Sequence, residues 1–288
     1  MDCNRTMEAV QFLHQSGFIT YPRTSSDTIA PCMRTYLHEI VQQQRNHRKW
    51  GADVLTHLSL ETGLNMNNGG HTDPAHSPIY PTMKVPTARE EAYWTADQRL
   101  VYELIVRHFL ASVSKPAEVQ QAYTRIRLGN DIFNGTTMKV ITPNFLVFLR
   151  IYEKDHPGFF MQQPVKLDLR IVASKPPPLS EGDLLDVMEK ENIGTNATRH
   201  ELLGKLLTLG YVLRDRNMNF TPTYLGKALI TGYIEMGAEV EPLWKPQYRQ
   251  NLENDLKLIE EGTENKDEVL QRHKGILTTC FQVTFGCF

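Results

Sequence analysis

The chain has 288 residues, 41% of them hydrophobic and 22% charged, which is enough for one large domain or two to three smaller ones with real cores. No apolar run approaches the roughly 20 residues that cross a bilayer, and no apolar signal core follows the N-terminus. The formal net charge of −2 gives no overall attraction for a polyanion, although local basic clusters such as residues 45–49 can still bind one.

The cysteines are scattered through the sequence and form no C-x-x-C pair; they are Cys3, Cys32, Cys280 and Cys287. This spacing argues against a zinc site and against a disulfide framework. We therefore expect reduced thiols, an intracellular protein and no metal site within this chain.

Helical and strand periodicities predict the elements of the first half: helices over 4–16, 33–46 and 96–114, a short strand over 18–21, and a polar loop over 63–75. In the first helix, Met7, Val10 and Leu13 recur near a 3.6-residue period, and Gly17 stands at the C-terminal cap position. Pro22 ends the strand because it has no backbone N–H.

After the third helix, the spacing of the hydrophobic residues changes from a helical to a strand period. Residues 118–173 are predicted to be β-rich, including Phe145–Phe148 and Leu167–Val172. The stiff run Pro176–Pro178 then marks the expected domain boundary.

Helical patterns return beyond this linker, over residues 180–190, 198–209, 223–236 and 246–261. Ser180 is the expected N-cap of the first of them, with Asp183 at the third helical position, and Gly210 ends the second. A hairpin is predicted around Arg214–Met218, and two helices followed by a hairpin are compatible with a winged helix. Residues 275–288 match no pattern.

The segment Gly17–Ser26 carries the densest chemical signal, G-F-I-T-Y-P-R-T-S-S. A phenol is a poor nucleophile unless it is activated, and Tyr21 alone would be an ordinary aromatic residue at the end of a strand. Arg23 lies two residues further on, across a proline bend, and its planar guanidinium matches phosphate oxygens.

This segment closely resembles the active-site motif of type IA DNA topoisomerases, and Pro22 with the later Trp50-Gly51-Ala52 is most similar to eukaryotic topoisomerase III. The resemblance implies that Tyr21 attacks single-stranded DNA and forms a 5′-phosphotyrosyl bond. It also implies that Arg23 binds the phosphate and that Thr24 and Ser25 contact the DNA.

A second motif, D-P-A-H-S-P-I-Y-P-T over residues 73–82, resembles the family's D-x-A-H stretch. It places His76 on the histidine that supports cleavage near the scissile phosphate, where an imidazole can donate a charge-assisted hydrogen bond or relay a proton. Tyr80 replaces a residue that is often His or Arg in the family.

A third motif, L-L-D-V-M-E-K-E-N-I-G-T-N-A-T over residues 184–198, resembles the family loop that holds the single strand beside the tyrosine. The DNA-binding residues that it implies are Thr195, Asn196 and Thr198, with phosphates at a helix N-terminus. The stretches 225–233 and 252–262 resemble packing signatures of the family.

The resemblance covers about residues 4–272 and implies an α+β multidomain fold, a partial type IA topoisomerase toroid. We expect a winged-helix-like tyrosine domain over residues 1–95, a β-rich gate arch over 96–175, and a mainly helical domain that holds the single strand over 176–288. A RecQ-type helicase as partner, no membrane contact, and a nuclear or mitochondrial location follow from the same resemblance.

Type IA enzymes also carry a Toprim domain, whose D-x-D-x-E carboxylates hold Mg²⁺, and this sequence contains no D-x-D-x-E. We therefore expect a fragment that binds no Mg²⁺ itself and needs the Toprim domain in cis or in trans. Without its carboxylates and general acid, the isolated chain is expected to cleave DNA hardly at all.

Three alternatives stand beside this interpretation. A non-catalytic nucleic-acid-binding or scaffold module of the same fold would bind DNA without forming an adduct. A tyrosine recombinase would carry its tyrosine near the C-terminus, the reverse of the order here. A metabolic enzyme would be expected to show a Gly-rich nucleotide loop or a metal cluster, and the sequence has neither.

Overall fold

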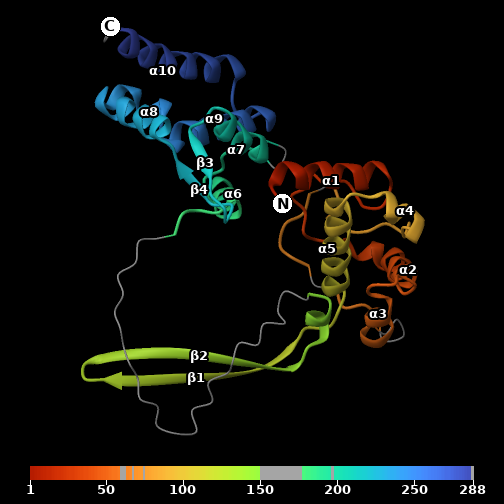
Figure 1. Cartoon of the computed structure of the whole chain (residues 1–288). Helices are drawn as coiled ribbons and strands as arrows, with labels where there is room; N and C mark the ends of the chain where they lie inside the picture. The colour runs from red at the N-terminus through yellow and green to blue at the C-terminus, as the bar shows by residue number, and fades with distance from the viewer. Residues whose placement is uncertain (59–62, 67, 74, 150–176, 196–197, 287–288) are drawn as a thin grey trace. The chain divides into compact units, whose positions relative to one another are not determined.

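The computed structural model describes the chain except for residues 59–62, 67, 74, 150–176, 196–197 and 287–288. Its contacts divide the chain into two compact units (Figure 1). The first unit comprises Met1 and Arg5–Val172, and the second comprises Asp2–Asn4 and Ala173–Phe288.

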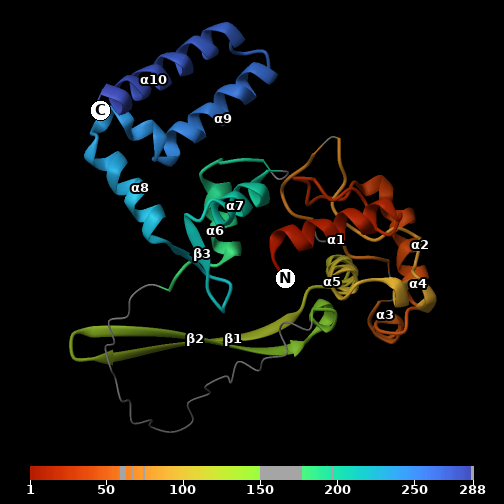
Figure 2. The same cartoon turned by 45° about the horizontal axis from the view of Figure 1, so that its top comes forward.

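The first unit begins with helical segments, seen from a second angle in Figure 2: α1 (Cys3–Gln15), η1 (Pro31–Met33), α2 (Arg34–Gln44), α3 (Gly51–His57), α4 (Ala88–Tyr93) and α5 (Ala96–Ser112). The helices predicted over 4–16, 33–46 and 96–114 are confirmed as α1, α2 and α5. Local hydrogen bonds determine where α4 and α5 begin. Thr87 forms a reciprocal capping box with Glu90 at α4, and Thr95 forms one with Gln98 at α5.

One hydrophobic core unites these helices. Leu13 of α1, Ile40 of α2, Val54 of α3 and Leu110 of α5 are each fully buried in it, and Trp50 is 1% exposed. Burying a side chain of this size stabilises a fold by about 1.5–3 kcal/mol. The division expected after residue 95 therefore lies between α4 and α5, within the first unit.

A long antiparallel hairpin follows the helices, with β1 (Glu118–Leu128) paired to β2 (Asp131–Thr142). The turn at Gly129 has φ of 62°, in the left-handed region that glycine adopts without strain. The prediction of β structure over Phe145–Phe148 is wrong, because η2 (Asn144–Val147) is a 3₁₀ turn there. The Phe145 N–H donates to the Lys115 carbonyl, and Phe148 is fully buried.

Two further expectations concern positions outside the described residues. The strand expected over Leu167–Val172 falls there, and so does Pro176 at the start of the expected linker.

The second unit consists of α6 (Glu181–Lys190), α7 (Arg199–Thr208), β3 (Val212–Arg214), β4 (Phe220–Pro222), α8 (Tyr224–Glu235), η4 (Ala238–Leu243), α9 (Pro246–Glu260) and α10 (Lys266–Gly286). The predicted cap of α6 is confirmed, since the Ser180 hydroxyl accepts from the Asp183 N–H and the Asp183 carboxylate accepts in return. The predicted hairpin is confirmed as the antiparallel pair of β3 and β4. Helix α10 was not expected.

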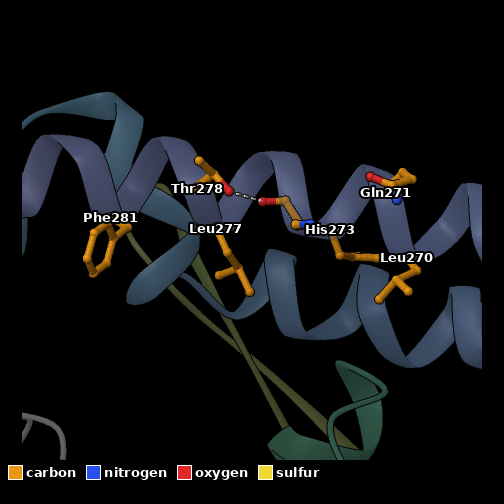
Figure 3. Close-up of a pocket in the computed structure, with 7 residues that line it drawn as sticks. Leu270, Gln271, His273, Leu277, Thr278 and Phe281 are labelled. Atoms are coloured by element: carbon orange, nitrogen blue, oxygen red, sulfur yellow. Dashed lines mark hydrogen bonds between the residues drawn. The ribbon is translucent and has the colours of Figure 1, made fainter.

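Helix α10 packs against η4 and α9 with one face, where Val269 and Cys280 are buried. Another face carries a shallow apolar hollow of about 470 Å³, and Figure 3 shows Leu270, Leu277 and Phe281 pointing to the same side of the helix there. Across the described residues, no helix combines the length and apolar character of a membrane span. Cys3, Cys32 and Cys280 are free thiols.

Candidate active site around Tyr21

The end of α1 places the tyrosine segment. The Gly17 N–H donates to the His14 carbonyl at 2.8 Å, and the Phe18 N–H donates to the Leu13 carbonyl at 2.9 Å, which closes the last turn. Gly17 has φ of 78°, so the chain can reverse there without strain. Phe18 and Ile19 are then each 2% exposed and anchor the segment in the core.

Residues 18–20 form a short ladder with residues 80–82 rather than a full strand. Ile19 and Pro81 form an isolated antiparallel bridge. The Thr20 N–H donates to the Tyr80 carbonyl and the Thr82 N–H donates to the Phe18 carbonyl, each at 3.0 Å. The two sequence motifs, at residues 17–26 and 73–82, are thereby joined backbone to backbone.

The hydroxyl of Thr20 adds two side-chain links to this ladder. It donates to the Pro78 carbonyl at 2.8 Å and accepts from the Tyr80 N–H at 3.0 Å. A hydroxyl is needed for this because it can donate and accept at once. Thr20 therefore fixes the Tyr21 segment against the segment that follows His76.

Tyr21 follows the last rung of the ladder, and its ring contacts two imidazoles. Its ring stacks on His76 at a centroid distance of 5.0 Å and an interplanar angle of 27°. His14 of α1 contacts the Tyr21 ring edge-on, at a centroid distance of 5.4 Å and an interplanar angle of 77°. Tyr21 keeps 36% of its surface exposed, so the phenol is accessible to a macromolecular substrate.

His76 is held by the Asp73 carboxylate. The His76 Nδ1 lies 3.1 Å from Asp73 Oδ2, while Asp73 Oδ1 accepts from the Ala75 and His76 N–H groups at 2.9 and 3.3 Å. The Ala75 hydrogen bond, together with His76, lowers the pKa of Asp73 below its usual value. Asp73 is thus an ionised acceptor at neutral pH.

A second pair of this kind joins the loops that flank the site. The Asp27 carboxylate accepts from the His71 N–H at 2.8 Å and lies 3.2 Å from His71 Nδ1. In the backbone, the Asp27 N–H donates to the His71 carbonyl and the Gly69 N–H donates to the Asp27 carbonyl. These contacts connect the chain after Arg23 to the chain before Asp73.

Arg23, Thr24 and Ser25 follow Tyr21 directly. Arg23 and Ser25 are exposed, and among the described residues Arg23 has neither an ion pair nor a hydrogen bond. The Thr24 hydroxyl accepts from the Ser26 N–H at 3.0 Å and so shapes the turn. A guanidinium left without an internal partner beside an accessible phenol is suited to an external anion.

The remaining predicted residues belong to the second unit, in the loop between α6 and α7. The Thr195 and Thr198 hydroxyls lie 3.2 Å apart, and the Thr195 N–H donates to the Thr198 hydroxyl at 2.9 Å. Gly194 precedes them with φ of 69°. Thr195 and Thr198 thus define the shape of the loop, and Asn196 lies outside the described residues.

Other polar residues of the motifs have internal roles. Tyr80 is 4% exposed and packs at 6.1 Å from Phe109, and burial raises the pKa of its phenol. The basic cluster at 45–49 is largely compensated, because Arg48 pairs with Glu91 at 2.7 Å and Lys49 pairs with Glu103 at 2.6 Å.

Sequence reasoning did not assign His14 or Asp73 to this site. The Asp73–His76 pair has a sequence signal, since an aspartate three residues before a histidine commonly accepts from the intervening backbone. His14 has no such signal, because its contact with Tyr21 depends on how the chain turns at Gly17. Among the described residues, no three His, Cys, Asp or Glu side chains gather closely enough to hold a metal ion.

Comparison with known proteins gives the family. A profile described as DNA topoisomerase matches residues 1–271. DNA topoisomerase 3-alpha of Arabidopsis thaliana is 38% identical over all of this chain, which covers 30% of that protein. DNA topoisomerase 3 of Caenorhabditis elegans is 33% identical over 96% of the chain, which covers 36% of it.

A solved structure has the same fold. Full-length topoisomerase I from Thermotoga maritima aligns with 99% of this chain at a TM-score of 0.68 and 21% identity, and the match covers 47% of that protein. The chain thus spans about a third of the length of its curated relatives and has the α+β architecture of part of a type IA enzyme. The chain belongs to the type IA DNA topoisomerases, among relatives named DNA topoisomerase 3.

Proposed function

We propose that this chain is the tyrosine-bearing and strand-holding part of a type IA topoisomerase, which changes DNA topology by transient cleavage of one strand. The observation that carries the proposal is the environment of Tyr21. Its phenol is accessible, stacked on His76 and two residues from the exposed Arg23. A nucleophile, an imidazole and a free guanidinium are the groups that attack on a phosphodiester needs.

The proposed step conserves the phosphodiester energy. The Tyr21 Oη attacks a backbone phosphorus, which forms the Oη–P bond and breaks the bond from phosphorus to the 3′ oxygen. The phenol loses a proton and the departing 3′ oxygen gains one. Religation runs the same exchange backwards, so the cycle needs no ATP. Arg23 would neutralise charge on the non-bridging phosphate oxygens.

The missing groups are proposed to come from a Toprim domain, in cis or in trans, which would bring Mg²⁺ with its own carboxylates. Thr24 and Ser25, and Thr195, Asn196 and Thr198 in the second unit, would contact the single strand. A RecQ-type helicase would be the partner of the complete protein in nuclear DNA repair and recombination, with a mitochondrial pool as a further location. The division into domains at 1–95, 96–175 and 176–288 is part of this proposal.

A covalent-adduct assay tests the proposal. The chain is mixed with a relative's Toprim domain, Mg²⁺ and a single-stranded oligonucleotide labelled at its 3′ end, because the 5′-phosphotyrosyl link retains the 3′ portion. A labelled protein band should survive denaturation and disappear in Tyr21→Phe. Tyr93→Phe is the matched control, since Tyr93 is 81% exposed on α4.

Two outcomes would contradict the catalytic proposal. An adduct that persists in Tyr21→Phe would place the nucleophile elsewhere. Salt-sensitive binding of the oligonucleotide without any adduct would instead assign the chain to the non-catalytic nucleic-acid-binding module.

A further inference from the structure

The two ring nitrogens of His76 have different surroundings. Nδ1 lies 3.1 Å from the Asp73 carboxylate, whose other oxygen is fixed by the Ala75 and His76 N–H groups. The side chains of His76 and Asp73 are 42% and 20% exposed, so the pair lies at the surface where a strand can reach it. No hydrogen bond to Nε2 of His76 is found within the described residues.

This arrangement determines which nitrogen carries the proton. An ionised carboxylate only accepts hydrogen bonds, so the nitrogen that faces it must be the N–H donor. In the neutral ring, Nε2 then carries the lone pair, and in the protonated ring it becomes a second donor. A carboxylate on one nitrogen is a common way to fix the tautomer and orientation of a working imidazole.

We propose that Asp73 is a positioning residue: it keeps the His76 proton on Nδ1 and the ring stacked on Tyr21, and it leaves Nε2 free, so that the protonated ring can donate from Nε2 to a DNA phosphate. The contact of His76 with a DNA phosphate rests on the proposed function. The tautomer of His76 does not, because it depends only on residues of this chain. Asp73 reaches Tyr21 only through the His76 ring, so it acts on orientation and proton placement and not on the reacting atoms.

The chain contains matched comparisons for this role. The Asp27–His71 pair has the same chemistry, with Nδ1 at 3.2 Å from the carboxylate, but its histidine side chain is 80% exposed and has no ring contact with Tyr21. His14 also contacts Tyr21, but its Nδ1 lies 3.3 Å from the backbone carbonyl of Ile19. This acceptor remains in place when the Asp73 side chain is changed.

The test is long-range ¹⁵N–¹H NMR of the imidazoles in the full chain at about pH 8, where histidine is ordinarily neutral. His76→Gln assigns the His76 signals. We expect a pyrrole-like Nδ1 and a pyridine-like Nε2 for His76. In Asp73→Asn the retained carbonyl oxygen still accepts from the backbone, so the amide NH₂ faces Nδ1 and the two nitrogens should exchange character.

The comparison variant is Asp27→Asn, which should alter the His71 signals and leave His76 unchanged, and neither variant should change His14. The proposal is overturned if wild-type His76 has its proton on Nε2. It is equally overturned if Asp73→Asn leaves the His76 tautomer as it was, or if Asp27→Asn alters it as much.

Addition of a single-stranded oligonucleotide separates this proposal from the proposed function. A change of His76 Nε2 from pyridine-like to protonated, with the proton on Nδ1 retained, supports both. If the Nδ1–H tautomer depends on Asp73 but no oligonucleotide moves either nitrogen, the tautomer assignment stands and the role toward DNA phosphate is refuted.

Discussion

Removing the Thr20 hydroxyl should loosen the join between the Tyr21 and His76 segments. Thr20→Val keeps the shape of the side chain, but the Tyr80 N–H loses its side-chain acceptor and the Pro78 carbonyl loses its donor. A part-buried donor left without a partner costs about 1–3 kcal/mol. We take a value of about 2 kcal/mol, which corresponds to a change of roughly 30-fold in the local opening equilibrium.

Amide hydrogen exchange reports this opening at single residues, which is needed in a chain with two compact units. The Tyr80 amide should exchange roughly 30-fold faster in Thr20→Val. The Thr82 amide, which donates to the Phe18 carbonyl, should change much less. In the adduct assay with a Toprim domain, the same variant should form less phosphotyrosyl product.

Thr20→Ser is the control, because it keeps the hydroxyl and loses only a methyl group. The reasoning is refuted if Tyr80 exchange is the same in Thr20→Val and in the wild type. It also fails if Thr20→Ser accelerates that exchange as much as Thr20→Val does.

Three other predictions concern binding, packing and pH. Arg23→Ala should weaken binding of single-stranded DNA and reduce the slope of log affinity against log salt by about 0.7, whereas Arg23→Lys should keep the slope; equal slopes in titrations of all three proteins would contradict this. Gly51→Ala should destabilise the first unit by roughly 2–3 kcal/mol, because the added methyl would overlap the Arg45 carbonyl oxygen. Gly135→Ala is its control, with no atom nearer than 4.0 Å, and similar melting of the two variants would refute the prediction. Burial lowers the pKa of His47 below 6.5, although the hydrogen bond with Glu91 acts in the opposite direction. As pH falls, His47 is therefore protonated at a higher pH in the unfolded chain than in the folded chain. The first unit should lose stability as pH falls below 6.5. His47→Gln should flatten this dependence in denaturation measurements, and an unchanged pH profile would rule it out.

The helices were predictable where short-range signals decide them. Ser180 with Asp183, three residues apart, fixes the start of α6, and Gly17 at φ of 78° fixes the turn after α1. These features depend on neighbours within one turn, which is the distance over which a sequence pattern is informative.

Other elements depend on partners far away in the chain. The apolar run Phe145–Phe148 suggests a strand, but the Lys115 carbonyl and burial of Phe148 select a 3₁₀ turn. Helix α10 was missed because Gly275 and three threonines interrupt its pattern, while its contacts with η4 and α9 stabilise it. Such tertiary stabilisation routinely overrides local propensity.

The candidate site was likewise predictable where a local motif identifies a residue, and not where a contact depends on distant parts of the chain. The motif identified Tyr21 and His76, but the ring stacking between them depends on the ladder of residues 18–20 with 80–82. The contact of His14 with Tyr21 depends on the turn at Gly17, and no spacing in the sequence specifies it.

The short ladder also has a mechanical consequence. If Tyr21 holds a DNA strand covalently, any tension in that strand enters the protein through the backbone of Tyr21, one residue beyond the rung between Thr20 and Tyr80. The force would be transmitted from there to Phe18 and Ile19, which are almost completely buried in the core. Pro22 cannot extend the ladder because it has no N–H, so the last backbone anchor of the attachment point is the rung at Thr20.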